Sequence, residues 1–89
     1  MRVIPSTEVV FRPVRDEGVL LDLRDNVLFT LNDTGVRVWQ LLEQHQQMDA
    51  VVQQMVEEFE VSEAQVRSDV ETLVEQLKEA SLVTVEGKP

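Results

Sequence analysis

The spacing of apolar residues changes along the chain from alternation to helical periodicity. In the first third, β-forming residues fill the run 9–15, and two further runs, 19–24 and 27–31, place alternate residues on opposite faces. Half-buried strands have this period of two, and turn residues at 16–18 and 25–26 separate the runs. The pattern predicts a three-stranded antiparallel meander.

The beginning of the chain carries less pattern. Residues 1–8, which include Pro5, are interpreted as a loose segment leading into the domain. Pro13 interrupts the run 9–15. Because proline donates no ladder hydrogen bond, the first strand is expected to lie at an edge of the sheet or to end there.

Helical periodicity begins after Asn32. This residue is a good N-cap for a first helix whose broad apolar face contains Val36, Val38, Trp39, Leu41 and Leu42. Trp39 is expected to be the largest piece of the core, and Gly35, in the first turn, is expected to allow a close approach.

Two further helices follow. The second is amphipathic, with apolar residues at Met48, Val51, Val52, Met55, Val56 and Phe59. Gln47 before it is a poor cap. The third begins at Ser62, with Gln65 completing a capping-box pattern, and runs to about Ala80. Residues 82–86 form a short closing strand or an extended tail.

Three strands followed by three helices predict an α+β fold. The arrangement is that of a winged helix-turn-helix, with a three-stranded antiparallel sheet followed by three helices. Eighty-nine residues suffice for a single domain with one core, which we expect to span about residues 7–85.

Charge excludes the function most often associated with that architecture. The formal net charge is −9, and residues 45–89 hold ten acidic and only three basic residues. Binding to nucleic acid needs a basic patch, whereas the third helix is mostly acidic. DNA and RNA are therefore not expected as partners.

Composition also bears on location. The chain has no cysteine, no apolar signal segment and no run long enough to cross a bilayer. We expect a cytoplasmic protein without a membrane association.

No catalytic constellation is present in the sequence. His45, the single histidine, lies in a polar run between two predicted helices and is interpreted as a solvated loop residue. The acidic residues show no metal-ligand spacing, and no phosphate-binding loop or nucleophile elbow occurs. We predict a protein that is not an enzyme and that uses no cofactor or metal.

The third strand suggests a binding surface instead. Residues 27–31 contain no proline and no charge, so this edge lacks the usual protection against pairing with another strand. An extended peptide could add to it by β-augmentation. Two alternatives are that residues 82–86 cover the edge or that it pairs in a homodimer.

The stretch LFTLNDTGVRVWQLL (28–42) carries a family resemblance. With Phe59-x-Val61, Val66-x-x-Asp69-Val70 and the closing Leu82-Val83, it resembles the PqqD-like family of precursor-peptide recognition elements. The resemblance covers about residues 7–85. The segment between the first two helices departs from the family, because it lacks the usual glycines and capping threonine.

This resemblance implies a non-catalytic winged helix-turn-helix protein. In the family, the leader of a ribosomally synthesised precursor peptide docks as a fourth strand on the third strand, against the third helix. Transferred to this sequence, the implied peptide-binding residues are Val27, Leu28, Phe29, Thr30, Leu31, Val66, Arg67, Asp69, Val70, Leu73, Val74 and Leu77.

The resemblance also implies a pathway and an enzyme partner. The chain is most similar to stand-alone recognition proteins of lasso-peptide clusters, which deliver the leader to a leader peptidase. The alternatives are a peptide chaperone of the pyrroloquinoline quinone pathway, an acidic helical adaptor and a winged-helix regulator.

Overall fold

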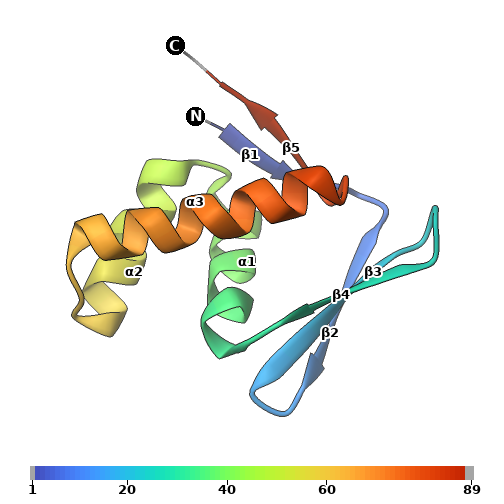
Figure 1. Ribbon diagram of the computed structural model, residues 1–89, viewed down its shortest axis with the longest axis horizontal. Coiled ribbons are helices and arrows are strands. Elements are labelled where there is room, and N and C mark those ends of the chain that lie inside the picture. Colours follow the sequence, from blue (N-terminus) through green and yellow to red (C-terminus); the bar gives the residue numbers. More distant parts are fainter. Residues whose placement is uncertain (1, 88–89) are drawn as a thin grey trace.

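A computed structural model describes residues 2–87 as three helices with two small antiparallel sheets (Figure 1). The elements in chain order are β1 (Arg2–Pro5), β2 (Val9–Val14), β3 (Glu17–Asp22), β4 (Val27–Leu31), α1 (Asp33–His45), α2 (Met48–Phe59), α3 (Glu63–Glu79) and β5 (Val83–Glu86). Within this part of the chain, no helix is long and apolar enough to cross a membrane. The predicted fold class, α+β with antiparallel strands before three helices, is confirmed.

The predicted meander is the sheet β2-β3-β4, in that order. Pro13 lies on the edge strand β2, as expected. β3 begins two residues earlier than predicted, at Glu17, because the turn is made by Arg15 and Asp16 rather than by residues 16–18. Arg15 adopts a left-handed conformation with φ of 58°, which a two-residue hairpin turn requires.

Gly18 belongs to β3 and not to the turn. A Cβ atom at this position would lie 2.9 Å from Cγ2 of Val36 on α1 and would also overlap the ring of Phe11 on β2. The missing side chain lets the sheet approach the helix closely. Gly18 was therefore misassigned because glycine is common in turns, whereas here it is needed for packing.

The start of the chain is not a loose segment, so that prediction was wrong. β1 pairs with β5, with Val3 opposite Val85 and Pro5 opposite Val83. Val3 is fully buried. Residues 82–86 do form a closing strand, but it pairs with β1 at the top of Figure 1 and leaves β4 uncovered.

Side chains at the helix starts explain where the helices begin. Asn32 Oδ1 accepts a hydrogen bond from the Gly35 N–H at 2.8 Å, and Ser62 Oγ accepts from the Gln65 N–H at 3.2 Å. Gln47 makes no side-chain cap, as its residue type suggests. His45 is the exposed last residue of α1, so it does not lie in a loop as predicted.

The core lies between the three helices and the inner faces of both sheets. Trp39 is almost fully buried, as expected, among residues that include Leu20 of β3 and Leu77 of α3. On the outer side of the helices, Arg37 of α1 forms two hydrogen bonds of 2.7 and 2.6 Å with the Glu58 carboxylate of α2. These bonds lower the pKa of Glu58 to about 2.

Candidate functional site

Strand β4 forms one free edge of its sheet. The strand order β2-β3-β4 leaves β4 paired on one side only, and β5 is engaged with β1. Leu28, the second residue of β4, is 65% exposed. The first alternative from the sequence, that residues 82–86 cover this edge, is therefore wrong.

The register of the sheet indicates which backbone groups β4 presents at its edge. Pro13 has no N–H and lies opposite Gly18, so we infer that this pair is not hydrogen-bonded. The backbone N–H and C=O of Gly18 must then point to its partner on the other side, Leu31 of β4. Along a strand, these backbone groups point to alternate sides from one residue to the next. By the same alternation, Phe29 bonds to β3, while Leu28 and Thr30 point their N–H and C=O groups away from the sheet.

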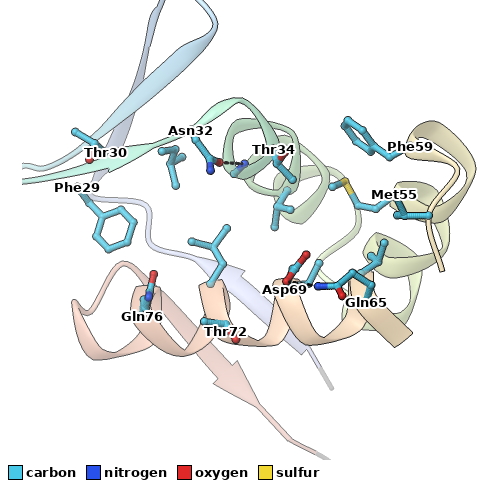
Figure 2. A pocket seen from close by; sticks show the side chains of 17 residues that line it. Phe29, Thr30, Asn32, Thr34, Met55, Phe59, Gln65, Asp69, Thr72 and Gln76 are labelled. Atoms are coloured by element: carbon cyan, nitrogen blue, oxygen red, sulfur yellow. Dashed lines mark hydrogen bonds between the residues drawn. The ribbon is translucent and has the colours of Figure 1, made fainter. Parts of the chain in front are cut away.

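A groove of about 630 Å³ lies beside β4 (Figure 2). One wall is β4 with the start of α1, the other is α3, and the end of α2 with the α2–α3 connection closes one end. The lining residues are Phe29, Thr30, Leu31, Asn32, Thr34, Gly35, Val38, Met55, Phe59, Val61, Gln65, Val66, Asp69, Val70, Thr72, Leu73 and Gln76.

The α3 wall of the groove combines an apolar floor with a polar rim. Val66 and Val70 are buried and Leu73 is half-buried. The exposed polar residues of this wall are Gln65, Asp69, Thr72 and Gln76, spaced 4, 3 and 4 residues apart, so they follow one stripe of the helix. Gln65 Nε2 donates to Asp69 Oδ1 at 3.0 Å, which places an acidic rim group over the groove.

The middle of the groove depends on Gly35. Its backbone N–H is bound by the Asn32 cap. A Cβ atom here would lie 3.2 Å from Asn32 Oδ1 and 3.3 Å from Cδ2 of Leu31, which is tighter than ordinary contacts. The absence of a side chain thus keeps the cap and the groove wall in place, in agreement with the close approach expected for this glycine.

Seven of the twelve residues proposed from the sequence line the groove. They come from both predicted walls: Phe29, Thr30 and Leu31 on β4, and Val66, Asp69, Val70 and Leu73 on α3. Phe29 and Leu31 are on the inner face of the sheet, in register with Leu20 and Gly18 of β3.

The other five lie elsewhere. Val74 and Leu77 are buried on the core side of α3. Arg67 is directed away from the groove, where its guanidinium pairs with Asp49 at 3.1 Å and with Glu63 at 3.4 Å. Val27 and Leu28 are exposed at the beginning of β4 and do not line the groove.

Sequence reasoning missed the end of the groove formed by α2. Phe59 and Val61 are 45% and 43% exposed and lie beside Met55 in the lining. Helical periodicity placed Phe59 on the apolar face of α2, which was expected to be buried. The periodicity shows which residues share a face, but it does not show whether another element covers that face. The quoted motif Phe59-x-Val61 was the available signal.

The groove has the features of a peptide-binding surface. Within residues 2–87, no group of three or more His, Cys, Asp or Glu side chains could hold a metal ion. The groove instead offers an apolar floor, a polar rim and a strand edge with free backbone donors and acceptors. An extended peptide supplies the complementary features.

Comparison with known proteins identifies the class. The family model described as "Coenzyme PQQ synthesis protein D (PqqD)" matches residues 17–83, and the chain belongs to this PqqD family. None of the curated proteins matches this chain in sequence.

Two solved structures are similar over nearly the whole chain. One, described as "TbiB1 in Complex with the TbiA(beta) Leader Peptide", is 28% identical, with a TM-score of 0.86 over 96% of this chain and 99% of that one. The other, "Lasso peptide synthetase B1 complexed with the leader peptide", is 27% identical, with a TM-score of 0.83 over 96% of this chain and 100% of that one.

Proposed function

We propose that this protein binds the leader segment of a ribosomally synthesised precursor peptide as a fourth strand on β4. The observation that carries the proposal is the free edge of β4 beside an apolar groove. Membership of the PqqD family, whose members bind leader peptides without catalysis, supports the same function. The two similar structures hold leader peptides.

The free edge and the groove act together in this proposal. The backbone groups of Leu28 and Thr30 pair with the leader, as in β-augmentation. Alternate leader side chains then face α3, on the same side of the sheet as Phe29 and Leu31. Val66, Val70 and Leu73 receive the apolar ones, while Asp69 and Gln65 favour hydrogen-bond donors at the rim.

The expected affinity is moderate. Each buried apolar anchor supplies about 1.5–3 kcal/mol. Association costs roughly 4–15 kcal/mol, and ordering a flexible leader adds to that cost. We expect a Kd on the order of 0.1–1 μM, or about −8 to −9.5 kcal/mol. Such an affinity suits a protein that passes its substrate on.

The finer part of the proposal is delivery of the leader to a maturation enzyme, the leader peptidase of a lasso-peptide pathway. Likeness to a lasso peptide synthetase B1 supports this pathway. Tethering by the leader raises the concentration of the precursor around the enzyme. The name of the family supports a second candidate, the pyrroloquinoline quinone pathway.

The outer face of the β2-β3-β4 sheet supports an enzyme partner. Val10, Leu21 and Leu28 lie in one row across the three strands, on the face opposite Leu20 and Phe29. Leu28 is exposed, and Val10 and Leu21 are half-buried, so this row leaves apolar surface in contact with solvent. Exposed apolar surface marks interaction sites, and this face lies opposite the groove.

A fluorescence-polarisation titration tests the function. The labelled probes are the TbiA(beta) leader, the leader peptide of the lasso peptide synthetase B1 complex, the leader of a quinone-type precursor and a DNA duplex. Submicromolar binding of a leader, without binding of DNA, is the expected result. Binding of none of the three peptides would contradict the proposal. Binding of DNA that weakens steeply with salt would indicate a winged-helix regulator instead.

A further inference from the structure

Asp22 is a buried carboxylate that does not line the groove. It is the last residue of β3 and is 1% exposed. A buried charge is costly unless it is paired and hydrogen-bonded. Here both carboxylate oxygens accept hydrogen bonds from Arg24. Oδ1 accepts from the backbone N–H and from Nε at 3.0 Å each, and Oδ2 accepts from Nη2 at 3.0 Å. These hydrogen bonds hold the pKa of Asp22 below its usual value.

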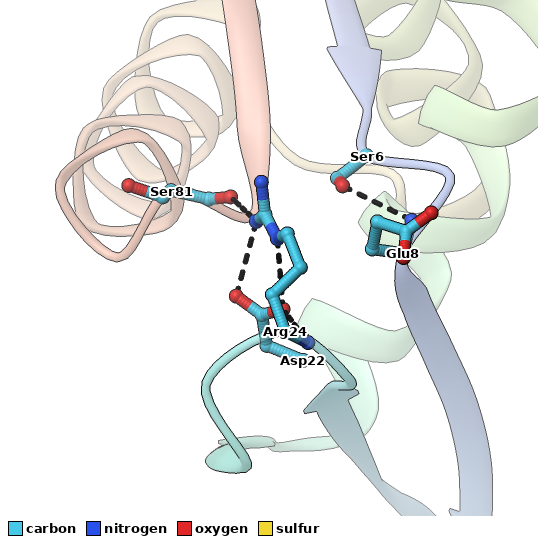
Figure 3. A network of polar contacts seen from close by, with 5 residues as sticks. All are labelled: Ser6, Glu8, Asp22, Arg24 and Ser81. Carbon is cyan, nitrogen blue, oxygen red and sulfur yellow. Dashed lines mark hydrogen bonds and ion pairs between the residues drawn. The ribbon is translucent and has the colours of Figure 1, made fainter.

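Arg24 also reaches the far end of α3. Its Nη2 atom donates a hydrogen bond to the carbonyl oxygen of Ser81 at 2.7 Å (Figure 3). Ser81 lies just beyond Ala80, the C-cap of α3, and has a φ of 62°. A cation at this position is favourable, because the carbonyls at the end of a helix carry partial negative charge. One side chain thus joins the β3–β4 loop to the end of α3.

Backbone hydrogen bonds reinforce the same junction. The N–H of Leu23 donates to the carbonyl of Glu8 at 2.9 Å, and the N–H of Ser6 donates to the carbonyl of Leu82 at 2.9 Å. The β3–β4 loop, the β1–β2 connection and the α3–β5 connection therefore meet at one point. Within the described part of the chain, the Arg24 bond is the one hydrogen bond that runs directly from the loop before β4 to the end of α3.

The position of this junction matters for the groove. β4 begins three residues after Arg24, and its other end continues into the capped start of α1. Among residues 2–87, no hydrogen bond joins a side chain of β4 to one of α3. The two walls are joined by apolar packing, since Leu31 of β4 belongs to the same core cluster as Val66 and Val70 of α3. The Arg24 hydrogen bond adds a polar link at one end of these walls.

We propose that the Asp22–Arg24 pair is a positioning element that fixes the separation of β4 from α3, and with it the width of the groove. The consequence for peptide affinity rests on the proposed function. Neither residue lines the groove, so neither touches the leader. The pair acts by keeping the β4 edge at the distance from α3 at which an added strand fits.

The structure provides a matched control for this pair. Arg37 and Glu58 also form a pair with two side-chain hydrogen bonds, of 2.7 and 2.6 Å, between α1 and α2, and neither residue lines the groove. Replacing Arg24 or Arg37 by lysine keeps the charge and removes the forked geometry in both cases. Arg24→Lys is expected to change the groove, whereas Arg37→Lys is not, even if both variants melt at a lower temperature.

The first measurement is made without peptide. Because the chain has no cysteine, Leu28→Cys and Glu75→Cys introduce unique sites for spin labels on β4 and α3. Double electron–electron resonance then reports the distribution of distances between the two walls. We expect Arg24→Lys to shift or broaden the distribution and Arg37→Lys to leave it unchanged. An unchanged distribution in folded Arg24→Lys would overturn the proposal.

The second measurement is the affinity of unlabelled variants for the leader that the wild-type protein binds, well below every melting temperature. If the competent groove is populated only about one tenth of the time in Arg24→Lys, the apparent Kd rises about tenfold. Arg37→Lys should stay within about twofold. Equal affinities of the two variants would refute the positioning role in binding.

Two further outcomes distinguish a failure of the proposed leader binding from a failure of the positioning role. If the wild-type protein binds no leader, the proposed function fails, but the spin-label distances still decide whether the pair positions β4. If Arg24→Lys does not fold, Asp22→Asn takes its place in both measurements, because it keeps the side-chain oxygen that accepts from the Arg24 N–H.

Discussion

The two sheets of this protein differ in what their strands leave exposed. β1 and β5 are only four residues each, yet they bury Val3 and Val83 against the helices. β4, in the larger sheet, leaves Val27 and Leu28 exposed and one edge unpaired. The small sheet therefore closes around the core, whereas the large sheet keeps an open edge at β4.

The largest effect is expected from placing a charge in each sheet. Val3→Asp buries an unpaired carboxylate, and we expect loss of the folded state in thermal unfolding followed by circular dichroism. Leu28→Asp, at an exposed position, should change the free energy of unfolding by no more than about 0.5 kcal/mol. Similar destabilisation by both would contradict the distinction between the two sheets.

Proline substitutions on β4 separate the edge from the fold. Leu28→Pro and Thr30→Pro remove N–H groups that we infer to point outward, so the sheet should persist while leader binding is lost. Each lost hydrogen bond is worth about 0.5–1.5 kcal/mol, and the ring adds a clash, so Kd should rise at least about tenfold. Titrations of both folded variants measure this.

The matched controls are Leu28→Ala and Thr30→Ala, which keep the N–H groups and should bind nearly as well as the wild-type protein. Unchanged affinity in both folded proline variants would rule out strand addition at this edge.

Two helix caps of equal strength distinguish stability from binding. Asn32→Ala, where the open sheet joins α1, and Ser62→Ala, at the start of α3, should each lower the free energy of unfolding by about 1 kcal/mol in urea titrations. Asn32 lines the groove and Ser62 does not. Leader affinity should therefore fall only for Asn32→Ala, and equal losses would contradict that assignment.

The smallest expected effect is on stability, from the Arg37–Glu58 pair between α1 and α2. The pKa of Glu58 is lowered to about 2 in the folded protein, from an ordinary value of 4.5. Its contribution to stability is therefore complete above pH 4.5 and is lost as the pH falls toward 2. Glu58→Gln should be less stable than wild type at pH 7 and differ less at pH 3, without a change in leader affinity at pH 7.

Local chemistry explains which parts of the fold could be predicted. The edge position of Pro13 and the caps at Asn32 and Ser62 follow from the residues themselves, and β4 matches its predicted range. β1 could not be predicted, because Val3 and Ile4 are too few to show alternation. Its partner β5 lies about eighty residues away, and only tertiary structure brings them together.

In the candidate site, too, some features follow from the local sequence and others depend on tertiary packing. The open edge followed from the absence of proline and charge in residues 27–31. The α3 wall was predicted too broadly, because one apolar stripe contains both the groove floor and the core, and Val74 and Leu77 lie on the core side. The Asp22–Arg24 pair could not be predicted from the sequence, because a single charged residue in a strand is normally expected to face solvent.

The unpaired edge of β4 also has a consequence for the protein in storage. A flat edge without charge or proline is a template for a second copy as much as for a leader. Concentrated peptide-free protein is therefore expected to associate slowly into higher species, and saturating leader should suppress this. Bound precursor would then also prevent two copies of the protein from pairing through their β4 edges.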